Sequence, residues 1–255
     1  MKVTVLGCGT SSGVPRIGND WGACDPDDAR NARTRSSILF ESAGKKLLID
    51  CGPDMRCQLL ANTVDRIDGV VITHDHADHC HGIDDLRQIA QMNRDQVPLF
   101  ARAKVLAALQ RRFGYMTKGT ALYPAVLTTH DIGEGMEWGN AAIRFVDQPH
   151  GSIQSLGLRF DEDGKSLGYA IDFHDMTDDM LAMYQGVDVL IADCLRRRPH
   201  PTHAHLEAVL DWAAQLKVGQ LYLSHLDNSM DYAKLAEELP AWAAPAHDGL
   251  EIGFA

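Results

Sequence analysis

The sequence predicts a mixed α/β (α+β) protein in which two β-sheets pack face to face and helices cover their outer faces. Short apolar, partly β-branched runs recur along the chain and are typical of strands. Other segments have the apolar spacing of amphipathic helices. The early strands follow one another closely, whereas the later ones alternate with helices. A four-layer αββα sandwich satisfies both patterns.

The elements can be assigned in chain order from these patterns. The predicted strands are Val3–Leu6, Ser37–Phe40, Lys46–Ile49, Gly69–Ile72, Val126–Leu127, Ala142–Val146, Leu156–Phe160, Leu167–Ile171, Val187–Ala192 and Gln220–Leu223. The predicted helices are Met55–Ala61, Ile83–Met92, Lys104–Phe113, Met176–Tyr184, Leu206–Leu216 and Tyr232–Leu239, with start signals at Thr177 and Thr202. Because no biased linker or repeat divides the chain, we expect one domain over residues 1–255.

Composition narrows the function classes. The chain is 45% hydrophobic and 23% charged, which is ordinary for a protein with a full core. Its formal net charge of -11 argues against a stable nucleic-acid partner, because such binding relies on clustered Lys and Arg. The 6 cysteines have no C-x-x-C spacing, which favours reduced thiols. The chain opens on the strand-like Met1–Leu6 and has no run of membrane-spanning length, so we expect a cytoplasmic protein without a membrane partner.

The run Thr73–His79 carries the strongest chemical signal. It places three imidazoles and two carboxylates in a short segment directly after an apolar strand. These are ligand types that divalent ions prefer, and four candidate ligands, His74, His76, Asp78 and His79, exceed what one ion with an open position needs. The alternative is a His-rich surface loop, which has no reason to follow Val70–Ile72 so tightly. The segment therefore predicts two ions.

Further ligand candidates are found where other predicted strands end. His150 follows Phe145–Val146, Asp172 follows Tyr169–Ile171, and His225 follows Leu221–Ser224. Sites in strand-based folds are commonly assembled at strand ends. Any one of these residues alone would more often be a hydrogen-bonded structural group.

The pattern His-x-His-x-Asp-His resembles the motif of the metallo-beta-lactamase superfamily, and the later candidates occur in the order of that family. The resemblance implies the αββα metallo-beta-lactamase fold and a dinuclear site. By resemblance His74, His76 and His150 hold one ion, Asp78, His79 and His225 hold the other, and Asp172 bridges them. Asp50 matches a carboxylate that orients ligand imidazoles, whereas His81 is expected to point elsewhere. Two ions about 3.5 to 4 Å apart can share a water and lower its pKa.

The segment Ala192–Leu206 indicates an anion-binding loop. It contains three arginines and the further histidines His203 and His205 ahead of a helix. Arg side chains and a helix N-terminus favour phosphate, so Arg196, Arg197 and His205 are candidate phosphate contacts, although the arginines could equally form a solvated turn. Two positions differ by about 200 degrees around a helix, so His203 and His205 would not face one site if both were helical.

Nearly the full chain resembles the PhnP family of cyclic phosphodiesterases. The shared segments are Leu6–Pro15, Glu251–Ala255 and the His-x-x-Leu pattern that begins at His203. The resemblance implies a homodimer, Mn or Zn as metal, and His203 as general acid or phosphate contact, with His205 as the alternative. We count His203 and Asp78 as the catalytic candidates. The family's additional structural zinc is not expected, because this chain offers only Cys24 and has Asn228 at the matching histidine position.

The predicted function is a metal-dependent hydrolase, most simply a phosphodiesterase. It would use a metal-bridging hydroxide on small, including cyclic, phosphodiesters such as phosphoribosyl 1,2-cyclic phosphate or nucleotide cyclic phosphates. A tRNA 3'-processing endonuclease is an alternative, but no protruding basic or glycine-rich arm is evident. Thioesterase or glyoxalase activity and a noncatalytic metal-binding domain are further alternatives. The segment Gly7–Gly13 has the wrong spacing for dinucleotide binding and is expected to border the site.

Overall fold

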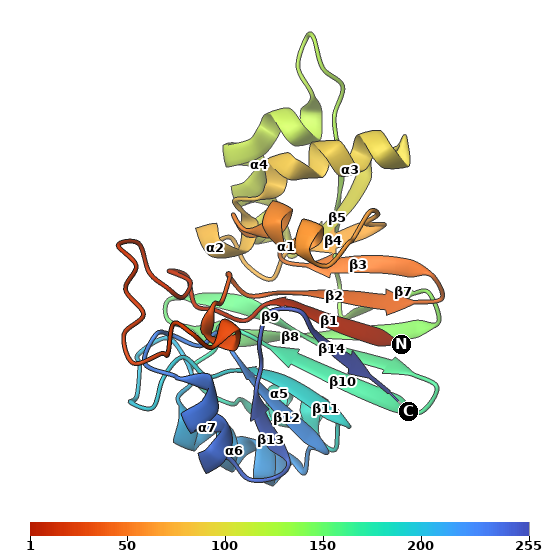
Figure 1. Ribbon diagram of the computed structural model, residues 1–255. Coiled ribbons are helices and arrows are strands. Elements are labelled where there is room, and N and C mark those ends of the chain that lie inside the picture. The colour runs from red at the N-terminus through yellow and green to blue at the C-terminus, as the bar shows by residue number, and fades with distance from the viewer. Residues whose placement is uncertain (255) are drawn as a thin grey trace.

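The protein consists of two β-sheets packed face to face between two layers of helices (Figure 1). This computed structural model describes residues 1–254, so Ala255 of the closing motif lies outside the described residues. The first sheet has seven strands in the order β14-β1-β2-β3-β4-β5-β6, and the second has seven in the order β13-β12-β11-β10-β9-β8-β7. The four-layer αββα sandwich predicted from the sequence is therefore confirmed.

The bounds of the strands follow the chain. Those of the first sheet are β1 (Lys2–Gly7), β2 (Ser37–Ser42), β3 (Lys45–Ile49), β4 (Gly69–Val71), β5 (Val97–Ala101), β6 (Leu127–Asp131) and β14 (Leu250–Gly253). Those of the second are β7 (Gly135–Trp138), β8 (Ala141–His150), β9 (Ile153–Glu162), β10 (Lys165–Ala170), β11 (Val189–Asp193), β12 (Gln220–Ser224) and β13 (Ala243–Pro245).

The helices form the two outer layers. On the first sheet lie α1 (Met55–Ala61), α3 (Leu86–Asn93) and α4 (Ala103–Lys118), and on the second lie α5 (Asp178–Tyr184), α6 (Leu206–Leu216) and α7 (Tyr232–Glu238) (Figure 1). A single turn, α2 (Ala77–Cys80), follows β4, and short 3-10 helices span Ala29–Asn31 and Ile83–Asp85. Between the sheets the core is apolar, and the Phe40 and Phe160 rings stack across it with centroids 4.3 Å apart.

The topology explains where the candidate residues meet. Strands β3 to β6 run parallel to one another, as do β10 to β13, so their carboxyl ends gather at one edge of each sheet. The His-rich segment follows β4, Asp172 follows β10, and His225 follows β12. Loops at the carboxyl ends of parallel strands are the usual place for a site in α/β proteins.

Several elements differ from the sequence prediction. Strands β5, β7, β13 and β14 were not predicted, and α4 runs beyond its predicted end at Phe113, where the backbone has non-helical dihedral angles (φ -123, ψ 32). The helical case considered for His203 and His205 does not apply, because both residues precede the helix. Helix α6 begins at Leu206, His205 is its extended N-cap residue, and His203 lies in the preceding loop.

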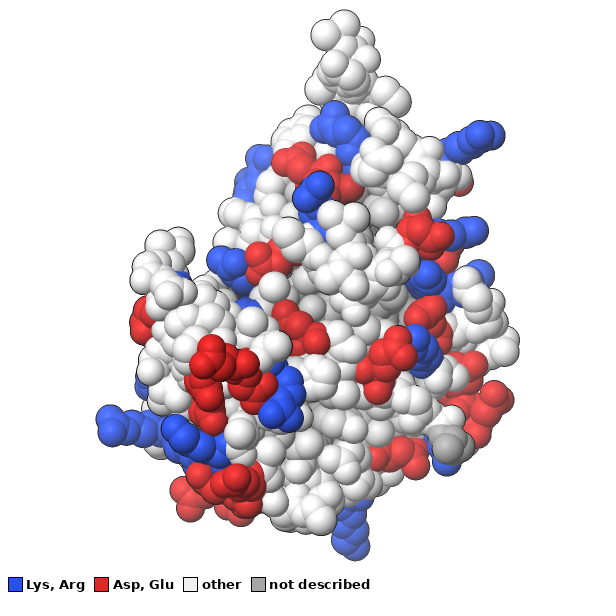
Figure 2. Space-filling view, viewed as in Figure 1, with Lys and Arg blue, Asp and Glu red and all other residues white. Residues whose placement is uncertain are grey.

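The loop after α4 projects from the first helix layer (Figure 1). Leu122 and Tyr123 in this loop are 85% and 61% exposed. The expectation that nothing protrudes is thus corrected, although residues 119–126 contain no Lys or Arg. Figure 2 shows basic and acidic side chains interspersed over the viewed face. Within residues 1–254, no helix is both long enough and apolar enough to cross a membrane.

Candidate functional site

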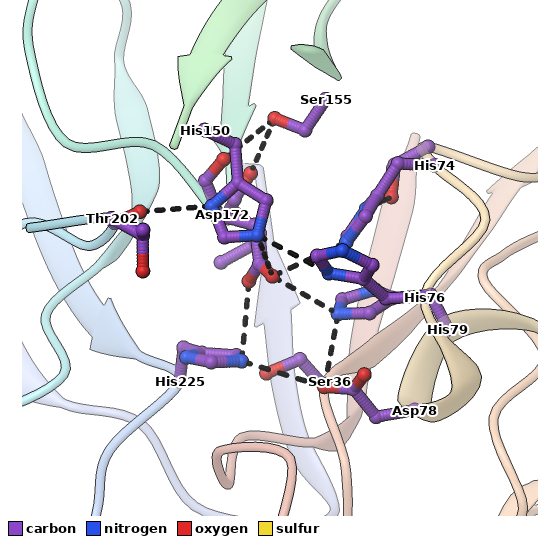
Figure 3. A network of polar contacts seen from close by, with 12 residues as sticks. Ser36, His74, His76, Asp78, His79, His150, Ser155, Asp172, Thr202 and His225 are labelled. Atoms are coloured by element: carbon purple, nitrogen blue, oxygen red, sulfur yellow. Dashed lines mark hydrogen bonds and ion pairs between the residues drawn. The ribbon is translucent and has the colours of Figure 1, made fainter. Parts of the chain in front are cut away.

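The segment after β4 turns its polar side chains toward the second sheet. His76 precedes α2 as an extended N-cap residue, and Asp78 and His79 lie on that single turn. His74 and His79 are fully buried, whereas His76 is more accessible. Because α2 is so short, His74, His76, Asp78 and His79 can all approach one point, as Figure 3 shows.

Asp172 stands at the centre of this arrangement (Figure 3). Its Oδ2 atom lies 3.4 Å from His74 Nε2, 3.4 Å from His79 Nε2 and 3.5 Å from His150 Nε2. Its Oδ1 atom lies 3.1 Å from His225 Nε2. The carboxylate therefore faces imidazoles from both sheets.

The side chains form three groups that share Asp172, of which one comprises Asp172, Asp193, His203 and His225 and the other two contain the predicted ligands. His74, His76, His150 and Asp172 offer ligand atoms within 4.8 Å of one another, and so do Asp78, His79, Asp172 and His225. The structure thus brings together all seven residues that the sequence pattern singled out. Imidazole nitrogens and carboxylate oxygens in sets of four suit zinc and manganese alike.

Asp50 supports two of these imidazoles from behind. Its Oδ1 accepts from Thr73 N–H at 2.8 Å, and its Oδ2 accepts from Thr73 Oγ1 at 2.9 Å and from His79 Nδ1 at 2.7 Å. Since the Thr73 hydroxyl donates to Asp50, it accepts from His74 Nδ1 at 3.0 Å. Both rings therefore carry their proton on Nδ1 and present Nε2 to the centre, which is how such support orients metal ligands.

The buried polar atoms at the centre fit a cation. Among residues 1–254, His74 Nε2, His79 Nε2, His225 Nε2 and Asp172 Oδ1 are buried without a hydrogen-bond partner. Buried polar atoms are normally paired, so several orphans aimed at one point need an explanation. A pair of divalent ions bound by these residues would satisfy all of them.

The electrostatics of the site also favour positive charge. Burial lowers the pKa of His225, but Asp172 and Asp78 outweigh burial and raise it to about 9. Burial likewise opposes a charged His79, yet Asp172 and Asp50 raise its pKa well above the ordinary value. At His150 burial prevails and lowers the pKa to about 4. The buried carboxylates thus create a negative potential that a proton or a metal ion can neutralise.

Three residues of the site adopt left-handed backbone conformations. The φ angles are 64° at Asp50, 57° at Asp172 and 58° at His225. Such angles are uncommon outside glycine and persist where the surrounding structure enforces them, often at functional sites. Asp50 and His225 directly follow a strand and Asp172 comes two residues after one, so the reversal turns each side chain into the space between the sheet edges.

His203 lies beside the metal-ligand candidates without belonging to the two sets that contain the predicted ligands. Its ring stacks on His225 with centroids 4.7 Å apart and an interplanar angle of 15°. Its Nδ1 donates to Asp193 Oδ2 at 2.8 Å, and Asp193 is fully buried. Burial raises the pKa of Asp193, although the hydrogen bond from His203 opposes this. Within residues 1–254, His203 Nε2 has no hydrogen-bond partner.

Asp193 and Thr202 are site residues that sequence reasoning missed. Asp193 ends β11, so the strand-end rule that found Asp172 would also have found it. Thr202 acts through its backbone carbonyl, which accepts from His150 Nδ1 at 2.8 Å. No side-chain pattern could have indicated that contact.

A cavity of about 210 Å³ opens over these groups. Its lining includes His76, Asp78, His150, Asp172, His203 and His225, together with Ser11 of the glycine-rich segment. The arginines of the later loop are engaged elsewhere. Arg196 donates to the carbonyls of Arg198 and Pro199, and Arg197 pairs with Glu238 at 2.6 Å.

The remaining histidines of these loops also lie apart from the lining. Within residues 1–254, His205 does not contribute to the lining of this cavity, and neither do Arg196 and Arg197. The ring of His81 packs edge-on against Phe113 with centroids 5.7 Å apart. His81 therefore packs against α4 and not at the cavity, and its pointing away from the site was expected from the sequence.

The fold and the arrangement of the candidate metal ligands are those of the metallo-beta-lactamase class of proteins. The chain belongs to the beta-lactamase superfamily, because the model of the beta-lactamase superfamily domain matches residues 45–226. A solved structure described as a new diphosphatase from the PhnP family is 35% identical, with a TM-score of 0.90, and the match covers 100% of this chain and 98% of that one. The PhnP-like branch inferred from the sequence is thereby confirmed.

Two curated relatives align with this chain over only about half of their own length. An octanoyltransferase of Porphyromonas gingivalis is 31% identical over 261 residues, which is 98% of this chain and 51% of that protein. A ribonuclease Z of Bradyrhizobium sp. is 27% identical over 133 residues, which is 50% of this chain and 44% of that protein. The chain thus spans about half of the first relative and less than half of the second.

Proposed function

We propose that the chain is a dinuclear metal-dependent phosphodiesterase that acts on small, including cyclic, phosphodiesters. In this proposal His74, His76 and His150 hold one ion, Asp78, His79 and His225 hold the other, and Asp172 bridges the two. The metal is Mn or Zn. Divalent ions in such a site lower the pKa of a coordinated water and polarise a phosphoryl oxygen.

The observation that carries the proposal is the His203–Asp193 pair at the edge of the metal cavity. Asp193 accepts the Nδ1 proton at 2.8 Å, so it fixes the orientation of the ring. A protonated His203 then presents Nε2–H to the cavity that it lines. Hydrolysis of a phosphodiester expels an alkoxide oxygen that must gain a proton, and a histidine placed there can donate it.

Similarity and size support a small substrate. The related solved structure is described as a diphosphatase of the PhnP family, and hydrolysis of phosphoric anhydrides and of phosphodiesters both require attack of water on a phosphoryl centre. The cavity of about 210 Å³ accommodates a phosphoryl centre and its nearest substituents. The charge of -11 and the interspersed charges in Figure 2 offer little support for a long polyanionic partner.

The test is turnover of a small cyclic phosphodiester by the purified protein loaded in turn with Mn and Zn. A thioester and a structured tRNA precursor serve as comparison substrates, and His203→Asn and Asp172→Ala serve as inactive controls. We expect hydrolysis of the small diester alone, and its loss in both variants. Cleavage of the tRNA precursor or the thioester, with the small diester untouched, would contradict the proposal.

A further inference from the structure

Asp75 is the one residue between the two candidate ligands His74 and His76, and a side chain from the outer helix layer holds it. Arg112 Nη1 donates to the Asp75 carbonyl oxygen at 2.6 Å, and Arg112 Nη2 pairs with the Asp75 carboxylate. Nη1 also lies 3.8 Å from Cys80 Sγ at the end of α2. One guanidinium therefore contacts both ends of the segment that carries the metal motif.

Neighbouring residues of α4 extend this contact. The Phe113 ring packs against His81 at 5.7 Å, and Tyr115 donates to Asp84 Oδ1 at 2.6 Å. Cys80 in turn donates to the His76 carbonyl oxygen at 3.1 Å. The second half of α4 is thus attached at several points to the segment 75–84, which includes His76.

The candidate ligands differ in what holds their side chains in place. Asp50 holds His79 directly and His74 through Thr73, from the inside of the fold. Within the described chain, the ring of His76 contacts only His150 by hydrogen-bond geometry, through its Nδ1 at 3.3 Å, and His150 is itself a candidate ligand. The position of His76 therefore depends on its backbone.

We infer that Arg112 is a positioning residue for the metal centre. It fixes the backbone at Asp75, thereby places His76, and sets the affinity of the ion held by His74, His76 and His150. This inference rests on the proposed metal site. The planar fork of Arg can donate to a carbonyl and a carboxylate together, which a Lys ammonium does less well. Removing support behind a metal ligand typically costs about 10–100-fold in affinity.

The experiment measures metal dissociation constants rather than turnover. The proteins are wild type, Arg112→Ala, Arg112→Lys and Arg111→Ala, each titrated with Zn²⁺ against a chromophoric chelator. Arg111 is a matched control, because it is exposed on the same helix and forms no hydrogen bond or ion pair among residues 1–254. Thermal melting of the metal-free proteins shows whether each variant is folded.

We expect Arg112→Ala to weaken one of the two ions about 10–100-fold and to leave the other near its wild-type affinity. Arg112→Lys should lie between, and Arg111→Ala should match wild type. In a double-mutant cycle, Asp75→Asn together with Arg112→Ala should lose no more affinity than the larger single change, because both remove one contact.

Two results would overturn the inference while leaving the proposed function intact. One is that folded Arg112→Ala binds both ions with wild-type affinity. The other is that the losses of metal affinity caused by Asp75→Asn and Arg112→Ala are additive in the double variant. A wild-type protein that binds no divalent ion would overturn the proposed metal site itself, and the inference with it. The wild-type titration alone therefore shows whether the metal site itself or only the role of Arg112 has been contradicted.

Discussion

Replacement of Asp50 by Asn isolates the effect of the buried carboxylate behind the metal ligands. Asp50 is fully buried, and its two oxygens accept three hydrogen bonds. An amide has one acceptor oxygen. If that oxygen takes the place of Oδ2, the bonds from Thr73 Oγ1 and His79 Nδ1 survive, but the amide NH₂ then faces the Thr73 N–H. In the opposite orientation only the Thr73 N–H bond survives.

At least one hydrogen bond to a charged group is therefore lost, which costs about 1.5–3 kcal/mol of folding stability. The His74 and His79 rings also lose part of their orientation, so we expect metal affinity to fall about 10–100-fold. The assay pairs chelator competition for Zn²⁺ with urea unfolding of the metal-free protein. Asp211→Asn, a change of the same chemistry at an exposed position of α6, is the control.

The outcome separates the two roles of Asp50. A loss of stability without a loss of metal affinity would mean that Asp50 serves the fold alone. Wild-type values for both would refute the argument that this carboxylate orients the imidazoles. Reduced metal affinity in Asp50→Asn, with Asp211→Asn unchanged, is the result that the geometry predicts.

Two further predictions concern other residues. His203→Asn should retain both ions, as measured by elemental analysis. Its kcat on a small phosphodiester should fall about 10²–10⁴-fold, because the change removes the proposed proton donor. Full turnover would mean that another residue donates the proton. Arg33 is 2% exposed and donates to Asn31 Oδ1, the Asp227 carbonyl and the Met230 carbonyl. Arg33→Met should therefore lower the free energy of unfolding by roughly 3–5 kcal/mol, because three buried acceptors lose their donor. Urea unfolding measures this, and a change below about 1 kcal/mol would disprove the prediction.

Sequence periodicity predicted the elements whose signal is local. Helix α6 has the predicted bounds Leu206–Leu216, and α5 begins directly after Thr177, whose side chain accepts from Met180 N–H. Helix α4 was predicted to end at Phe113, directly before Gly114, whereas the helix continues across a kink at Phe113. Tertiary packing on the first sheet outweighs that local signal.

The missed strands depend on distant partners. Strand β5 contains Pro98, which argues against a strand when only the local sequence is considered. Strand β14 has only four residues and is paired with β1, almost the whole chain away. Pairings of this kind are decided by the assembled sheet and leave no periodic pattern in the sequence.

The residues that meet at the candidate site were easier to select from the sequence than the missed strands, for a physical reason. Metal ligands need particular side chains, and those side chains are visible in the sequence at strand ends. Contacts made through the backbone, such as His150 to the Thr202 carbonyl, or across layers, such as Arg112 to Asp75, leave no such signal. The orientation of the Arg196 and Arg197 side chains could not be predicted either. The partner of Arg197, for example, is Glu238 on helix α7, which is distant in the sequence.

The most direct test of the central proposal is the number of divalent ions bound per chain, measured by elemental analysis on protein loaded with Zn and freed of excess metal. We predict two ions in the wild-type protein and a loss of at least one in Asp172→Ala, because Asp172 alone contacts both groups of ligands. One ion or none in the wild type, or two ions retained in Asp172→Ala, would contradict a dinuclear centre bridged by Asp172.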